Sequence, residues 1–217
     1  MKFIYLILAR KGSVRIKNKN LKKIKNKSLV EHSIDFAKKV AEVDKIILST
    51  DSNLIRNIGK KKGLNIYHLR PKRLSKANTS SYDSAIYEVK KYEKNNNKID
   101  AIVLLQPTTP FRSVKTYNKL KKIFISDPNK PLISVKKLAL ESNRIFKKNK
   151  NYLTHYDYKK RNSIFIPNGA YFFISKKTLN RNKSFFSKKM NFYEIKNLKE
   201  NIDIDTKEDL FFAKKIS

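Results

Sequence analysis

The chain lacks cysteine and tryptophan, and its 217 residues include only four glycines and six prolines. Without cysteine it can form no disulfide, no thiolate metal site and no cysteine nucleophile. No apolar run approaches the ~20 residues of a membrane-spanning helix, and the apolar stretch at 3–9 runs into Arg10 and Lys11 without a small-residue cleavage site. We therefore expect a cytoplasmic protein without a membrane segment.

Negative charge is also scarce, because 18 acidic residues stand against 51 basic ones and leave a net charge of +33. A surplus of this size favours anionic ligands and is typical of proteins that bind nucleic acid. The lysines, however, fall on almost every predicted helix and loop and do not form one stripe. Nucleic-acid binding is therefore an alternative that the distribution of charge does not favour.

The rest of the composition is that of a folded domain, with 40% hydrophobic residues, 13 Phe and 11 Tyr in a chain long enough for one full-sized core. Apolar runs rich in strand formers alternate with segments of helical periodicity. The predicted strands are 3–8, 45–50, 66–69, 99–105 and 132–135, followed by 170–174 and one within 190–198. This alternation predicts a single α/β domain over 1–217 with a doubly wound, mostly parallel sheet.

Local signals place the helices between these strands. Ser28 and Glu31 form a capping box, Asp51 is expected to cap the next helix, and Gly63 suits its C-terminal end. The predicted helices cover 28–42, the segment up to 63, 78–93, the segment up to 126, and a last helix capped by Thr206 and Asp209.

The alternation breaks at about 137–166, a passage rich in Lys, Asn and Tyr. A loop of this length in a compact domain is usually functional. We expect either a strand excursion that pairs with a partner subunit or a lid. Pro167, Asn168 and Gly169 after it are typical of a turn.

The loop after the first strand is crowded with cations. In open α/β sheets ligands bind at the carboxyl ends of the strands. Gly12 and Ser13 could bring backbone N–H groups close to a phosphate, and Arg10, Arg15 and Lys19 supply positive charge. The loop is neither a G-x-G-x-x-G nor a Walker A sequence. It predicts a polyphosphate site, and a solvated basic turn is the alternative.

Two further loops carry polar side chains. The sequence QPTTPFR at 106–112 follows the most apolar strand, and its two prolines restrict it, so it could hydrogen-bond a nucleotide base or a polyol. The hydroxyl-rich run that ends in Ser81 opens a helix, where it could bind an anion or a sugar or serve only as a cap.

Asp203 and Asp205 point to one face of an extended segment, while Ile202 and Ile204 point to the other. Two like charges on one face predict a Mg²⁺ site, since Mg²⁺ typically takes one or two carboxylates together with substrate phosphates. Pairing with nearby lysines is the alternative.

Taken together, the motifs resemble those of the acylneuraminate cytidylyltransferases, or CMP-sialic acid synthetases, and of the related CMP-legionaminic and pseudaminic acid synthetases. They are, in order, LARKGSVRIKNKN (8–20), STDS (49–52), LRPKRLSKANTSSYD (69–83), VLLQPTTPFR (103–112), ISV (133–135), PNGAYFFI (167–174) and IDIDTKEDL (202–210). The resemblance is collinear over nearly the whole chain and implies a Rossmann-like nucleotidyltransferase fold.

The resemblance implies transfer of CMP from CTP to the anomeric hydroxyl of a nine-carbon 2-keto sugar acid, with pyrophosphate leaving on Mg²⁺. It also implies a homodimer, with the excursion at 137–166 as the dimer contact. The implied nucleotide-binding residues are Arg10, Gly12, Ser13, Arg15, Lys19, Asn20, Arg70 and Ser81; the sugar-binding residues are Gln106, Arg112, Asn168 and Gly169. Asp203 and Asp205 would hold the metal, and Arg10, Lys19 and Asp205 would act in catalysis.

The chain departs from the family pattern at two places. Val14 stands where the family loop usually has lysine, so Arg15 is the nearest candidate to replace that cation. The passage at 139–166 is short and matches poorly. Two alternatives follow: a related nucleotidyltransferase that acts on another keto-sugar acid or a sugar phosphate, and an inactive relative.

Overall fold

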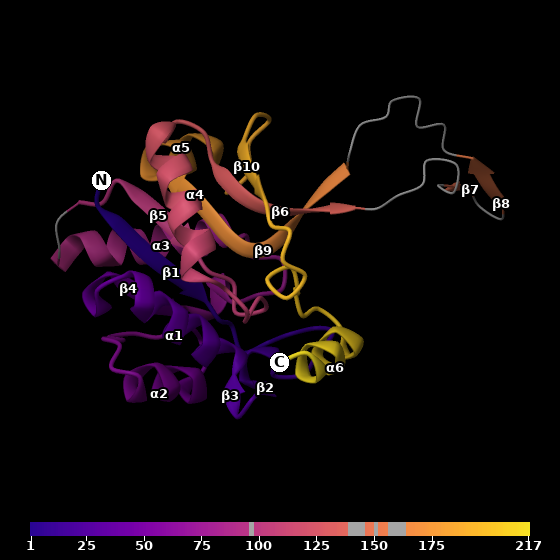
Figure 1. Cartoon of the computed structure of the whole chain (residues 1–217). Coiled ribbons are helices and arrows are strands. Elements are labelled where there is room, and N and C mark those ends of the chain that lie inside the picture. The colour runs from indigo at the N-terminus through magenta and orange to yellow at the C-terminus, as the bar shows by residue number, and fades with distance from the viewer. Residues whose placement is uncertain (96–97, 139–145, 150–151, 156–163) are drawn as a thin grey trace.

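A six-stranded sheet forms the centre of the protein, with the strand order β10-β6-β9-β5-β1-β4 (Figure 1). The computed structural model describes residues 1–95, 98–138, 146–149, 152–155 and 164–217. The strands are β1 (Phe3–Leu8), β4 (Ile46–Ser49), β5 (Ala101–Leu104), β6 (Leu132–Leu138), β9 (Ile164–Ser175) and β10 (Asn191–Glu194). β1 pairs in parallel with β4 and β5, and β6 with β10, whereas β9 is antiparallel to both β5 and β6. The predicted mostly parallel sheet is confirmed.

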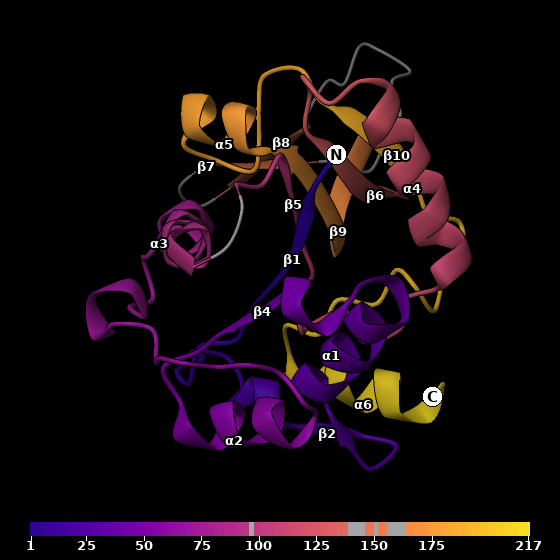
Figure 2. The ribbon, with the colours of Figure 1, turned by 90° about the vertical axis from the view of Figure 1, so that its left-hand side faces the viewer.

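Helices cover both faces of this sheet, as the doubly wound prediction requires (Figure 2). The helices on the sheet are α1 (Leu29–Val40), α2 (Asn53–Lys61), α3 (Ser81–Asn95), α4 (Val114–Ser126) and α5 (Lys176–Asn182), and the last helix, α6 (Lys207–Lys215), packs instead against the segments that contain Ile16 and Ile204. Short 3-10 turns lie at η1 (Lys19–Leu21), η2 (Val43–Lys45) and η3 (Lys72–Leu74), and two small antiparallel pairs join β2 (Lys23–Ile24) to β3 (Lys27–Ser28) and β7 (Phe146–Asn149) to β8 (Tyr152–His155). None of the helices in the described part of the chain has the length and apolar content of a membrane span.

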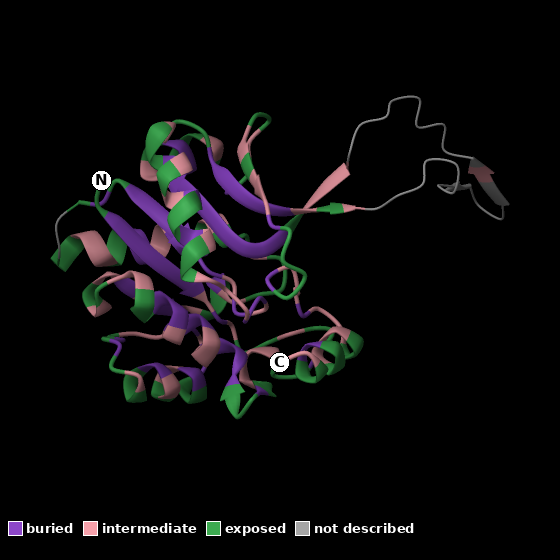
Figure 3. Ribbon diagram, in the orientation of Figure 1, coloured by how far each residue is buried: buried purple, intermediate pink, exposed green. Residues whose placement is uncertain are grey.

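β1 shows why the central strands are continuous apolar runs. Its residues alternate between two hydrophobic clusters: Tyr5 and Ile7 belong to the one with residues of α1 and α4, and Ile4 and Leu6 to the one with residues of α3. A parallel strand covered on both faces has no side that faces water, so polar residues are excluded from both sets of positions. Figure 3 shows the resulting buried centre and the exposed outer surfaces of the helices.

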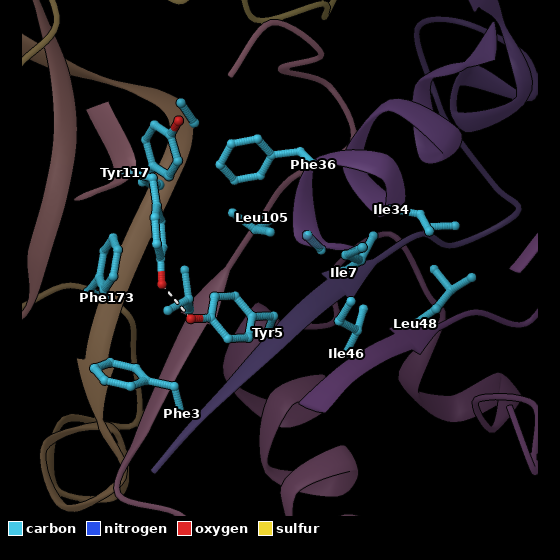
Figure 4. Packing of buried hydrophobic residues seen from close by; sticks show 14 of the residues in the cluster. Phe3, Tyr5, Ile7, Ile34, Phe36, Ile46, Leu48, Leu105, Tyr117 and Phe173 are labelled. Carbon is cyan, nitrogen blue, oxygen red and sulfur yellow. Dashed lines mark hydrogen bonds between the residues drawn. The ribbon is translucent and has the colours of Figure 1, made fainter. Parts of the chain in front are cut away.

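Aromatic residues fill the core beneath α4 (Figure 4). Tyr117 lies 5.8 Å, ring centre to ring centre, from Phe173 and 6.1 Å from Phe36, and its hydroxyl hydrogen-bonds that of Tyr5. Burial raises the pKa of Tyr117, which keeps this phenol neutral. The two buried hydroxyls satisfy one another, so the core carries no unpaired polar group at this point.

A smaller cluster joins the two ends of the chain. Ile16, from the loop after β1, is buried with Ile204 and with Ala213 of α6, and Ile202 packs against the cluster. The predicted inward orientation of both isoleucines at 202 and 204 is therefore confirmed. Because Ile16 and Ile204 share this cluster, the basic loop and the Asp203 segment are brought together.

Three local predictions are wrong. Residues 66–69 form no strand. The segment makes one backbone hydrogen bond next to β4, from the Arg70 N–H to the Thr50 carbonyl oxygen over 2.7 Å, which does not make a strand pair. Asp51 does not cap α2; Ser52 does, through the Ile55 N–H. The expected turn at 167–169 lies inside β9, where the pairing with β6 shifts between Ile133 and Val135 and Gly169 has a φ of 77°. Turn-forming residues also form bulges, which lengthen a strand instead of ending it.

The other helix-end predictions are confirmed. Ser28 and Glu31 form a capping box, as do Thr206 and Asp209, and Gly63 follows the end of α2 with a φ of 82°. The excursion predicted at 137–166 lies mostly outside the described residues, apart from the ends of β6 and β9 and the β7–β8 pair.

Candidate active site

A cavity of about 440 Å³ opens at the carboxyl ends of β1 and β5. It brings together ten of the fourteen residues that the sequence motifs single out: Arg10, Gly12, Ser13, Lys19, Asn20, Arg70, Ser81, Gln106, Asp203 and Asp205. These residues come from five separate segments of the chain. Thr79, Ser80 and Thr108, from the two polar loops that were predicted to bind a ligand, also line the cavity, and Ser84 adds a hydroxyl that no motif indicated.

Hydrogen bonds fix the basic loop at its start. The Lys11 N–H donates to Oδ1 of Asp51 over 2.6 Å, and the Asn20 side chain donates to the Arg10 carbonyl oxygen over 2.9 Å. Asn20 thus holds the loop in addition to lining the cavity. Gly12 has open space around it, since a Cβ placed there would meet nothing within 4 Å. The loop is therefore shaped before any ligand arrives, and its free backbone is accessible.

Arg70 is the buried cation of the site, with 6% of its surface exposed. Its Nη1 donates to Ser84 Oγ over 3.1 Å and its Nη2 to the Ser49 carbonyl oxygen over 2.9 Å, while Nε has no partner within the described part of the chain. Burial lowers the pKa of Arg70, the negative charges of Asp51 and Glu88 oppose that shift, and the positive charge of Arg10 adds to it. Two guanidinium groups held close together are suited to a ligand with several negative charges.

Asp203 lines the same cavity. Its Oδ1 atom is enclosed and has no hydrogen-bond partner among the described residues. Burial raises the pKa of Asp203, which a hydrogen bond from Thr108 opposes. The neighbouring Ile204 N–H donates to the Thr108 carbonyl oxygen over 2.9 Å, which fixes this segment against the loop after β5. An enclosed carboxylate oxygen without a donor is costly unless a ligand completes it.

Asp205 meets two cations of the basic loop. Lys19 Nζ lies 2.7 Å from its Oδ1 and Arg15 Nη1 3.1 Å from its Oδ2. Although partial burial acts to raise it, the hydrogen bond and charge of Lys19, with the charge of Arg15, lower the pKa of Asp205. Asp205 is therefore ionised at neutral pH. Arg15 does not line the cavity but contacts its rim through this carboxylate.

Gly169 lies directly behind Gln106 and Asp203. A Cβ on Gly169 would come 2.9 Å from Gln106 Oε1 and 3.2 Å from Asp203 Oδ2, and its positive φ also disfavours any other residue. Gly169 does not line the cavity, but it allows the bulge of β9 to approach the two side chains that do.

Arg112 and Asn168 are placed away from the cavity. Arg112 donates to the carbonyl oxygens of Gln106 and Ala170 over 2.6 and 2.7 Å, and burial lowers its pKa to about 10. Asn168 is fully buried and bonded to Ser134 and Asn201. In this structure both residues hold the loop and the bulge that carry Gln106 and Gly169, instead of facing the cavity.

A smaller cavity of about 240 Å³ adjoins the first and shares Ser80, Ser81, Leu104 and Gln106 with it. Its other lining is mainly aromatic, from Tyr82, Phe172, Phe185 and Phe186. The hydroxyls and the amide thus stand between a charged compartment and an apolar one. No sequence motif indicated this second compartment.

The residue at the departure from the family loop is exposed. Val14 has 83% of its surface accessible, so nothing in the structure requires an apolar side chain there. The guanidinium of Arg15 is paired with Asp205 at the rim of the cavity, with Nη1 3.1 Å from Oδ2.

Comparison with known proteins places these motifs in a family. The sequence model of the cytidylyltransferase family matches residues 4–217. The chain is 28% identical to the CMP-N,N'-diacetyllegionaminic acid synthase of Legionella pneumophila, over all of this chain and 96% of that protein. It is 30% identical to the N-acylneuraminate cytidylyltransferase of Escherichia coli over 98% of this chain, and spans 51% of that longer protein.

Among solved structures, the fold is similar to that of CMP:2-keto-3-deoxy-manno-octonic acid synthetase complexed with CTP, with a TM-score of 0.72. The match covers all of this chain and 98% of that one at 15% sequence identity. At that level of identity the likeness concerns the fold.

Proposed function

This chain belongs to the cytidylyltransferase family, and from that premise we propose that it transfers CMP from CTP to the anomeric hydroxyl of a nonulosonic, sialic-acid-like sugar and releases pyrophosphate. Membership of the family confirms the resemblance carried by the seven motifs. The proposal names the nine-carbon acids because relatives at 28–30% identity over nearly the whole chain are named for legionaminic and neuraminic acids.

The observation that carries the proposal is the pairing of two kinds of charge in one cavity. Arg10, Lys19 and Arg70 present cations on the walls, and Asp203 presents a carboxylate oxygen that has no protein partner in the described structure. A site for a simple anion would exclude carboxylates. A site for a nucleoside triphosphate with its metal needs both.

Mg²⁺ fits the residues present. The described residues contain no cluster of three or more His, Cys, Asp or Glu side chains, as a site formed by protein ligands alone would need. They do contain two carboxylates on one wall, the arrangement that suits Mg²⁺ when substrate phosphates and water supply the remaining ligands. Asp203, with its unpartnered Oδ1, and Asp205 would hold the ion, which when bound neutralises the charge that develops on the departing pyrophosphate.

The chain's own residues then have distinct tasks. Gly12 and Ser13 offer backbone N–H groups to the triphosphate, and Arg10 and Arg70 balance its charge. The anomeric oxygen attacks the α-phosphorus, the bond from that phosphorus to the β-phosphate oxygen breaks, and the hydroxyl proton is lost to solvent. Catalysis of this kind consists of positioning together with stabilisation of charge in the transition state.

The acceptor is proposed to lie where the two cavities meet. Gln106 and Ser80 can hydrogen-bond sugar hydroxyls, and the aromatic lining beyond them suits apolar substituents such as acetyl or deoxy positions. This arrangement favours an acylated, deoxygenated sugar acid over a fully hydroxylated one.

The family resemblance also motivates two proposals about assembly and place. We propose a homodimer in which the segment at 137–166 makes the contact, testable by light scattering on the full chain and on a variant with that segment shortened. We propose a cytoplasmic enzyme, since CTP is an intracellular nucleotide; fractionation of cells that express the tagged protein would check this.

The deciding experiment incubates the protein with CTP, Mg²⁺ and a panel of N-acetylneuraminic, diacetyllegionaminic and pseudaminic acids, and measures pyrophosphate release. Turnover of at least one acid with CTP, and none when ATP replaces CTP, is expected. Turnover of only an eight-carbon keto acid or a sugar phosphate would replace the acceptor in the proposal. No turnover of any acceptor, together with RNA binding that weakens steeply with salt, would favour the nucleic-acid alternative.

A further inference from the structure

Glu88, on the face of α3 that packs against the sheet, is a buried carboxylate behind the wall of the cavity. Only 3% of its surface is exposed, and it does not line the cavity. Its Oε1 accepts a hydrogen bond from Ser49 Oγ over 2.6 Å, and its Oε2 lies 3.0 Å from Nε2 of His68. A buried carboxylate is retained at considerable cost, and no reaction step assigned above uses this one.

Ser49, the last residue of β4, links Glu88 to the site. Its carbonyl oxygen accepts two hydrogen bonds of 2.9 Å, one from the Ala9 N–H and one from Nη2 of Arg70. Ala9 precedes Arg10 directly, so one peptide group fixes both the base of the basic loop and the buried guanidinium. The hydroxyl of Ser49 donates its hydrogen bond to Glu88.

We propose that Glu88 is the positioning residue of the nucleotide site: through Ser49 it fixes Arg70 and the start of the basic loop in the arrangement that binds the triphosphate. This inference rests on the proposed function. The negative charge of Glu88 also acts on Arg70 directly, against the burial that lowers the pKa of that arginine. His68 occupies the second carboxylate oxygen, which leaves Glu88 a single orientation toward Ser49.

The consequence is specific to the nucleotide. Glu88 is connected to Arg70 and Ala9, whereas Gln106 and Asp203 depend on the loop after β5 and on the bulge of β9. Loss of Glu88 should therefore weaken CTP binding and leave acceptor binding unchanged. A side chain that only stabilised the fold would lower the melting temperature and the active fraction without changing either KM.

The test compares Glu88→Gln with Glu93→Gln by calorimetric titration with CTP and by steady-state kinetics. Glu93 is the matched control, because it lies on the same helix and pairs with Lys176 at 2.7 Å, outside the lining of the cavity. For Glu88→Gln we expect the Kd and KM for CTP to rise about tenfold, a typical effect of removing a group that orients a ligand-binding side chain, with the acceptor KM unchanged. Glu93→Gln should leave all three constants unchanged.

A double-mutant cycle tests whether Glu88 affects CTP binding through Arg70. In an Arg70→Gln background, Glu88→Gln should cause no further loss of CTP affinity if Glu88 acts through Arg70. Ser49→Ala, which removes only the hydroxyl that connects them, should weaken CTP binding in the same direction and provides the measurement if Glu88→Gln fails to fold. Unchanged CTP constants in both Glu88→Gln and Ser49→Ala, or losses that add fully to that of Arg70→Gln, would overturn the inference.

The wild-type titration separates this inference from the function on which it rests. A wild-type protein that binds CTP and releases pyrophosphate, while Glu88→Gln behaves identically, refutes the role of Glu88 alone. A wild-type protein that does not bind CTP refutes the proposed function, and the role of Glu88 with it.

Discussion

The two ends of the sheet carry cavities that differ in character. The cavity at the amino-terminal end, lined by the start of β1 and the end of α1, has a volume of about 740 Å³, against about 440 Å³ for the candidate site. Six lysines line it, and three of them have ordinary partners: Lys45 pairs with Glu42, Lys38 donates to the Lys62 carbonyl oxygen, and Lys121 lies over two aromatic rings.

The comparison shows that neither the volume of a cavity nor the positive charge of its lining identifies the candidate site. Lysines at the ends of helices such as α1 complement the helix dipole and need no ligand. Among the described residues, four enclosed side-chain atoms have no hydrogen-bond partner, and two of them, Nε of Arg70 and Oδ1 of Asp203, belong to residues that line the candidate site; the other two, on Arg56 and Asn182, lie outside both cavities. The candidate site thus differs from the other cavity in being lined by two residues of opposite charge that each carry such an atom, an arrangement typical of ligand sites.

The largest expected effect is that of Arg10→Ala. Loss of a cation that faces the polyphosphate should lower the rate by about 100- to 1000-fold, or roughly 3–4 kcal/mol of transition-state stabilisation, with the fold intact. Lys121→Ala at the other end of the sheet is the matched control and should retain the full rate. Steady-state pyrophosphate assays and circular dichroism measure both. A wild-type rate for Arg10→Ala would refute the assignment of the loop.

Asp205→Asn should reduce the rate by at least about 100-fold, because the metal's work depends on this carboxylate. The melting temperature should change by only a few degrees, since the ion pairs of Asp205 with Lys19 and Arg15 are partly exposed and worth roughly 0–1 kcal/mol. The residual activity should need more Mg²⁺ for half-saturation. Full activity with an unchanged Mg²⁺ titration curve would leave the Asp pair as charge balance for lysines.

Gly169→Ala should destabilise the protein by roughly 1–3 kcal/mol, because it combines a φ of 77° with a Cβ 2.9 Å from Gln106 Oε1. Since the displaced side chain lines the cavity, the acceptor KM should rise as well. Gly12→Ala, where a Cβ has open space, is the control for stability. Thermal melts and acceptor titrations measure the two effects; equal melting temperatures would contradict the predicted strain.

Val14→Lys should retain the rate or raise it a few-fold, since the side chain is exposed and a lysine there can extend toward the ligand. Arg15→Ala should cost more than its place outside the cavity suggests, because Arg15 follows Val14 directly in the sequence and its guanidinium contacts Asp205 at the rim. Rates at several ionic strengths check both. A complete loss in Val14→Lys would show that the loop follows a different path around its ligand, and an unchanged rate in Arg15→Ala would remove the compensation by Arg15.

The smallest effect concerns Asp35, a paired carboxylate outside both cavities. Partial burial acts to raise its pKa, but hydrogen bonds from Lys27 and Lys62 hold it below its ordinary value. A depressed pKa contributes stability above the ordinary value and loses it as the pH falls through the folded-state value. At pH 7, Asp35→Asn should therefore lower the free energy of unfolding by less than about 1 kcal/mol and the melting temperature slightly. At strongly acidic pH, where Asp35 is protonated, the substitution should leave the melting temperature unchanged. Asp203→Asn, at an unpartnered oxygen, should not lower it at pH 7.

The sequence was a good guide wherever a local interaction decides the outcome. The apolar run at 3–8 could only be a doubly covered strand, and the capping box of Ser28 with Glu31 fixed the start of α1. Its failures lie where a residue type permits two structures. Gly169 suits a turn and a bulge equally, and only pairing with β6 decided for the bulge.

The candidate site divides in the same way. The sequence indicated the basic loop and the Asp203 segment from their chemistry, but not that Ile16 and Ile204 bring them together in one cluster. It also gave both Arg70 and Arg112 a place in the site, since each is an arginine in a loop that follows a predicted strand, whereas only Arg70 lines the cavity. Their partners, which lie far away in sequence, leave an unpartnered Nε on Arg70 at the cavity and enclose Arg112 behind it.

By itself, then, the amino-acid sequence determined the α/β alternation, the helix ends, the charged and carboxylate motifs and the family, because these depend on neighbouring residues or on residue types in order. Only the tertiary structure decided that β9 enters the sheet antiparallel between β5 and β6, that Arg70 faces the cavity, and that Glu88 lies beneath Ser49. Those outcomes depend on burial and on hydrogen-bond partners tens of residues away, for which a linear pattern carries no signal.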